Sequence, residues 1–183
     1  MVPETDNIIL MAEARINDDI VIKSNERQEI GTMDGAVIFF PEDFHRLERL
    51  TIMLRGEEKT IGYVAPTAAE DYTLTPDDPF GYTVLDQAIH LFPTPNANYE
   101  YTLYYIPRVK TVVGGTTNWL LTIRPDVYLF ACLTYAAAFL KDDEQMAKND
   151  ALYSNQLEKL KSAEKGRYRP MSGNSIRMTR RTI

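Results

Sequence analysis

Residues 127–140 form the longest nearly apolar run in the chain, and the run includes Thr134 and Tyr135. It is too short to cross a bilayer, because a transmembrane helix takes about 20 apolar residues. Pro125 and Asp126 come directly before it, and both residue types favour the first turn of a helix. We therefore predict a helix that begins at Pro125, is apolar on most of its faces and is buried in a folded domain.

A second helix is predicted directly after this run. Asp142 and Gln145 have the spacing of a capping box, and the helical pattern ends near Gly166. The short turn 141–143 then joins the two helices into an α-hairpin. The apolar stripe of the second helix consists of Met146, Tyr153, Leu157 and Leu160.

A shorter amphipathic helix is predicted near the amino-terminal end, over residues 6–21. Its apolar residues recur every three or four positions, which is the period of one helix face. They are Ile9, Ala12, Ile16 and Ile20.

The segment between these helical parts has the pattern of a small antiparallel β-domain. Short apolar or alternating runs are separated by turn residues throughout it. Asp34-Gly35 favours a tight turn and predicts a β-hairpin around it, and residues 41–44 resemble a helical turn. The predicted strands are residues 27–32, 36–40, 50–54, 60–64, 82–85, 88–92 and 98–106.

The predicted fold class is therefore α+β. An amino-terminal helix (1–24) precedes the antiparallel β-domain (25–113), a helical hairpin (114–166) follows a hinge at Gly114-Gly115, and an extended tail (167–183) ends the chain.

Charge is distributed unevenly along the 183 residues, whose net charge is −6. Residues 165–183 carry six basic residues and no acidic one, so residues 1–164 hold 14 basic and 26 acidic residues, a net charge of −12. An acidic body argues against wrapping nucleic acid, and a basic end favours contact with another molecule. The single Cys132 excludes a disulfide within the chain, and no export signal is visible at the start.

The residue types that carry catalysis do not form a recognisable constellation. His45 and His90 lack partners at metal-ligand spacing, and no Gly-x-Ser-x-Gly motif is present. Asp71, Asp77 and Asp78 could bind calcium, but neighbouring prolines interrupt the loop and favour a solvated acidic turn. We expect no enzyme activity, no metal and no cofactor; a hydrolase that uses His45 or His90 is the remote alternative.

A tyrosine-rich strand supports one alternative function, a small module that binds single-stranded nucleic acid. Its aromatic rings could stack on bases if a basic groove lay beside them. Only Arg108 and Lys110 are close in sequence, which favours a strand packed in a core. The aromatic residues are Phe92, Tyr99, Tyr101, Tyr104 and Tyr105.

The order of these parts, more than any one motif, resembles the head-to-tail adaptor proteins of short-tailed bacteriophages. The most specific block is residues 117–143, with Asn118-Trp119-Leu120-Leu121, Pro125-Asp126 and Leu140-Lys141-Asp142-Asp143. Residues 12–17, 40–44 and 103–105 are similar to that family's first helix, its proline-aspartate-phenylalanine turn and the strand before the hinge.

The resemblance implies a structural virion protein that assembles beneath the portal after DNA packaging. It implies a ring, typically of twelve copies, between the portal protein and the tail or nozzle protein at the neck of the virion. Assembly in the host cytoplasm, passage of genomic DNA without sequence-specific binding, and no membrane partner are expected as well. An acidic channel wall would repel the phosphates of the DNA.

Two sets of site residues follow from this interpretation. The tail is expected to dock to the portal, although a free solvated tail is the alternative. The hairpin is expected to pack between subunits, although the β-domain could cover the same faces. The portal-binding residues are Arg167, Tyr168, Arg169, Met171, Ile176, Arg177, Met178, Arg180 and Arg181, and the subunit-packing residues are Trp119, Tyr128, Tyr135, Met146 and Tyr153.

Overall fold

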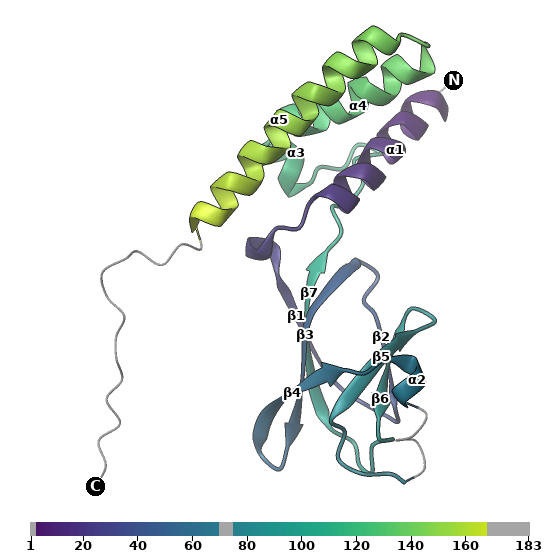
Figure 1. Ribbon diagram of the computed structural model, residues 1–183, viewed down its shortest axis with the longest axis vertical. Coiled ribbons are helices and arrows are strands. Elements are labelled where there is room, and N and C mark those ends of the chain that lie inside the picture. Colours follow the sequence, from purple (N-terminus) through teal and green to yellow (C-terminus); the bar gives the residue numbers. More distant parts are fainter. Residues whose placement is uncertain (1–2, 70–74, 168–183) are drawn as a thin grey trace, which may run out of the picture.

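A layer of helices at one end of the molecule and a curled β-sheet at the other make up the computed structural model (Figure 1). The structure describes residues 3–69 and 75–167. This arrangement confirms the α+β class. Among the described residues, no helix is both long and apolar enough to span a membrane.

Four helices pack around one core in the helical layer. The predicted α-hairpin is confirmed, and the Asp142 carboxylate accepts a hydrogen bond from the Gln145 N–H at 3.0 Å at the start of its second helix. One short helix was not predicted; it begins where Asn118 accepts a bond from the Leu121 N–H. The helices are α1 (Pro3–Asp19), α3 (Trp119–Ile123), α4 (Pro125–Phe139) and α5 (Asp143–Arg167).

Seven strands form the sheet, in the order β1-β7-β3-β4-β5-β6-β2. Consecutive strands β1 and β2 stand at its opposite edges, yet only residues 33–36 join them, so the sheet has to curl. The strands are β1 (Arg27–Thr32), β2 (Val37–Phe39), β3 (Phe44–Leu54), β4 (Glu57–Tyr63), β5 (Gly81–Leu85), β6 (Ala88–Phe92) and β7 (Glu100–Pro107), with helix α2 (Pro66–Ala69) between β4 and β5.

Three details of the β-domain differ from prediction. The predicted hairpin around Asp34-Gly35 is wrong: the chain bends at residues 34–36, with Gly35 at φ 93°, but β1 pairs with β7 and β2 pairs with β6. Residues 41–43 form a turn that leads into β3 and not a helical one. The sheet is mixed, because β4 and β5 run parallel while the other neighbouring pairs are antiparallel.

Two separate hydrophobic cores result from this arrangement. One joins α1 to α3, α4 and α5, and the other fills the concave side of the sheet. The chain crosses between them twice, through residues 20–26, which include the 3-10 helix η1 (Lys23–Asn25), and through residues 108–118. The helical core therefore combines the beginning of the described chain with its end.

Candidate assembly surfaces

Helix α4 buries one face and exposes another, although both are apolar. Its buried residues include Val127, Ala131 and Thr134, which face the core shared with α1 and α5. Leu129 and Leu133 are 54% and 38% exposed. Their spacing of four positions places them on one side of the helix. We call these two residues the α4 ridge.

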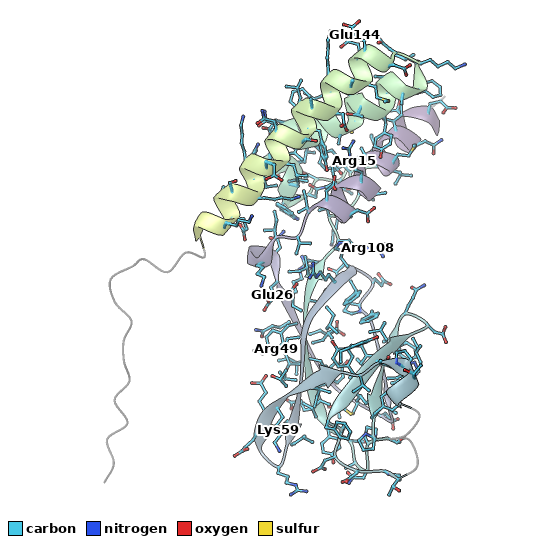
Figure 2. All side chains as sticks on the ribbon, viewed as in Figure 1. Arg15, Glu26, Arg49, Lys59, Arg108 and Glu144 are labelled. Atoms are coloured by element: carbon cyan, nitrogen blue, oxygen red, sulfur yellow. The ribbon has the colours of Figure 1, made fainter. Side chains whose placement is uncertain are left out.

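A second apolar surface lies between α1 and α4, at the end of the molecule farthest from the sheet. It is a groove of about 480 Å³ whose lining includes Glu4, Tyr135 and Ala138. Leu10, Met11 and Phe139 also line it and are 48%, 53% and 60% exposed. In Figure 2, Glu144 marks this end of the molecule. We call the groove together with Leu140 and the turn 141–144 the tip.

Glu13 joins three segments of the helical layer. It is 5% exposed, and its Oε1 accepts hydrogen bonds from the Val112 N–H at 2.7 Å and from the Tyr128 hydroxyl. One turn further along α1, Asn17 Oδ1 accepts a bond from the Val109 N–H at 2.7 Å. Burial, with the bond to Glu13, raises the pKa of Tyr128 well above its ordinary value. These contacts fix α1 to α4 and to the second crossing.

Arg124 holds the sharp bend between α3 and α4 against α5. Its guanidinium donates two bonds of 2.9 Å to the Asp126 carboxylate and one of 3.2 Å to the Gln156 carbonyl. The bond from Arg124 lowers the pKa of Asp126 below its ordinary value. The pair keeps the start of α4, and hence the α4 ridge, at a fixed angle to α5.

We expect Asp126→Asn to lower the free energy of unfolding by about 0.5–1 kcal/mol at pH 7, because the pair is partly exposed. A carboxyl group whose pKa is lower in the folded state than in the unfolded state stabilises the fold at pH values above its unfolded-state pKa. This contribution disappears as the pH falls through its folded-state pKa. Urea unfolding of both proteins at pH 7 and at pH 3 measures this. A difference that does not shrink at pH 3 would contradict the explanation.

The crossings are held by polar contacts on the β-domain side. Arg108 donates from Nε to the Phe44 carbonyl at 3.0 Å and from its backbone N–H to the Asp43 carbonyl at 2.7 Å. The Asp43 carboxylate pairs with Arg27 at 2.5 Å and accepts a bond from the Tyr105 hydroxyl. Arg108 lies between the two bodies in Figure 2.

The predicted portal-binding residues lie almost entirely outside the described part of the chain. Arg167 is the last residue of α5. Tyr168, Arg169, Met171, Ile176, Arg177, Met178, Arg180 and Arg181 are outside the described residues. Their role stays a prediction.

The predicted subunit-packing residues all lie in the helical layer. Tyr128 and Tyr153 are buried in the core of the single chain, and the Tyr153 hydroxyl donates to Asp19 Oδ2 at 2.8 Å. Trp119 and Tyr135 are half-buried against that core, and Met146 is half-buried on α5. Contact of these side chains with a neighbouring subunit stays a prediction. The exposed α4 ridge and tip were not singled out from the sequence.

The residues considered for catalysis or metal binding are dispersed. His45 is on β3 and His90 is on β6, with β4 and β5 between them. Asp71 lies outside the described residues, whereas Asp78 pairs with Arg55 and accepts a bond from the Tyr99 hydroxyl at 2.6 Å. No group of three or more potential metal ligands occurs within residues 3–69 and 75–167.

The tyrosine-rich strand does not present a row of rings to solvent. Tyr105 belongs to the core of the sheet, and Tyr99 and Tyr101 pack against that core. Tyr104 lies under the Arg49 guanidinium, whose carbon is 3.9 Å from the ring centroid. Packing in a core, which the sequence favoured, is therefore confirmed for Tyr99, Tyr101 and Tyr105.

The exposed apolar surfaces of the helical layer are suited to contact with other proteins. The sequence profile of the SU10 adaptor protein family matches residues 2–178. The chain belongs to the SU10 adaptor protein family. The match includes both bodies and most of the basic tail. A search of curated proteins finds no match.

As a member of the SU10 adaptor family, the chain is a phage adaptor protein and a structural component, not a known type of enzyme. The family implies partners such as portal and tail proteins and a position at the neck of the virion. The function of a SU10 adaptor depends on contact between proteins, and the α4 ridge, the tip and the tail are the candidate surfaces for such contact.

Proposed function

We propose that this SU10 adaptor forms a ring, with twelve copies the expected number, between the portal and the tail or nozzle protein of a short-tailed phage. The observation that carries the proposal is the α4 ridge, which exposes two leucines on a helix that is already apolar on its buried face. In a ring of identical subunits, the ridge would pack against a different surface of the next copy.

The basic tail supplies the second contact of the proposed adaptor. Its arginines match an acidic surface on the portal, and its apolar residues would be buried there as the segment orders. The acidic body, at −12 over residues 1–164, would let genomic DNA pass through the completed channel without adhering. The adaptor would dock to the portal after DNA packaging, in the host cytoplasm.

Ring formation is expected to depend on the α4 ridge. Leu129→Asp with Leu133→Asp places two charges on the contact and should weaken self-association at least 100-fold. The melting temperature should change little, because both side chains are already exposed. Analytical ultracentrifugation in the presence of portal measures the association.

Leu152→Asp is the matched control, because this α5 leucine is 42% exposed and lies outside the ridge. Rings that form equally well with the ridge variant would overturn the assigned surface. Loss of the ring with both variants would indicate a general effect of added charge.

Mass by light scattering, for the chain alone and after mixing with the portal of its own phage, tests the proposal as a whole. Twelve copies gained per portal supports it, and a different fixed number corrects only the ring size. A chain that never binds portal but binds single-stranded nucleic acid in a salt-dependent manner would overturn it in favour of a nucleic-acid module.

A further inference from the structure

The tip combines exposed apolar side chains with acidic ones. Phe139, Leu140 and Met11 are each more than half exposed, and Glu4 lines the same groove. Asp142, Asp143 and Glu144 follow Leu140 after a single lysine, and all three are exposed. The Asp142 carboxylate caps α5 and Glu144 pairs with Lys148, but both bonds lie on the surface and leave the region acidic. A segment that carries basic and apolar residues together fits such a surface.

The chain itself contains one segment of this chemistry, residues 167–183. The segment has five arginines and no acidic residue. Its apolar residues include Met171, Ile176 and Met178, which are spaced among the arginines. We propose that the tip is a docking surface for residues 167–183 of a second copy of this chain.

The length of α5 explains why the tail would come from a second copy. The helix has 25 residues, so it separates the tip from Arg167 by about 36 Å. Met171 and Ile176 are four and nine residues beyond Arg167, and an extended chain of nine residues reaches at most about 32 Å. These two anchors cannot reach the tip of their own subunit, whereas Met178, eleven residues beyond Arg167, could span about 40 Å. All three apolar residues can therefore bind one tip together only if that tip belongs to another copy.

This contact is separate from the ring and gives the tail a second site. A copy that has not met a portal would have its tail on the tip of another copy, and portal subunits would compete for that tail. The contact should weaken steeply with salt, because arginines and carboxylates provide part of it.

A fluorescent synthetic peptide of residues 167–183, titrated into the full-length protein, tests the proposal by anisotropy. We expect saturable binding that falls at least ten-fold between 50 mM and 500 mM salt. Phe139→Ala with Leu140→Ala, and separately Asp143→Lys with Glu144→Lys, should each weaken binding at least ten-fold. Melting curves check that both variants are folded.

The matched controls are Leu152→Ala on α5 and Glu57→Lys on β4, which change an exposed apolar and an exposed acidic residue away from the tip. Both should bind the peptide like the unmodified protein. A peptide with Met171, Ile176 and Met178 replaced by serine should bind at least ten-fold more weakly. No binding to the unmodified protein, or equal binding to the tip variants and the controls, would overturn the proposal.

The tip variants retain their own tails, so they also separate this inference from the proposed function. They should still bind portal. For the unmodified protein, portal binding without peptide binding would overturn the tip contact alone, and peptide binding without portal binding would overturn the adaptor contact alone.

Discussion

Replacing Glu13 with alanine is expected to lower the free energy of unfolding by roughly 3 kcal/mol. The Val112 N–H and the Tyr128 hydroxyl both donate to this buried side chain and would lose their acceptor. An unsatisfied buried donor costs about 1–3 kcal/mol, and the truncated side chain leaves a cavity as well. Urea unfolding monitored by circular dichroism measures the change.

Two variants separate the polar network from the loss of volume. Glu13→Gln keeps the shape and an acceptor oxygen and should cost less than alanine. Tyr128→Phe removes the facing hydroxyl, so the double variant Glu13→Ala with Tyr128→Phe should cost less than the sum of its parts. Strict additivity would show that the two side chains do not act as a unit.

Removing residues 167–183 is expected to abolish portal binding, with a loss of at least 100-fold in affinity. The body should still fold, because the described core residues all lie between Ile9 and Leu160. A melting temperature within about 2 °C of the full-length value, together with no mass gain on portal in light scattering, is the expected result.

Full-length variants show which part of the tail acts. Replacing Arg177, Arg180 and Arg181 with glutamine should weaken binding most at low salt, because exposed charges are screened at high salt. Replacing Ile176 and Met178 with serine should weaken binding at all salt concentrations. Unchanged portal binding by the truncated chain would reject the docking role of the tail.

Local sequence signals predicted the elements of this fold better than their partners. Arg55 and Gly56 adopt positive φ and join β3 to β4, which pair with each other. The chain also bends at residues 34–36, where Gly35 alone has positive φ, yet the strands on either side diverge to opposite edges of the sheet. A turn sets the direction of the chain, whereas the partner of β1 is a strand that begins 68 residues after β1 ends, which no local pattern encodes.

For the assembly surfaces as well, local sequence signals predicted the helix but not its contacts. The excess of apolar residues on α4 was visible in the sequence, and it predicted a helix that is apolar on most of its faces, in a hairpin that packs between subunits. Which side stays exposed depends on where α1 and α5 pack. Tyr128 and Tyr153 are buried because their hydroxyls reach Glu13 and Asp19, which lie 115 and 134 residues away in the chain. Separations of this size leave no periodic signal.

The position of the β-domain between α1 and α3 also has a consequence for the order of folding. If the sheet were unfolded, docking α1 onto α4 would close a loop of about 100 residues. Arg27 and Tyr105 are paired in register, so a folded sheet brings the two crossings side by side. The loop then shortens to roughly 26 residues, which reduces the entropy cost by about 1.2 kcal/mol. The sheet should therefore form first, and α1 should join the helical layer late.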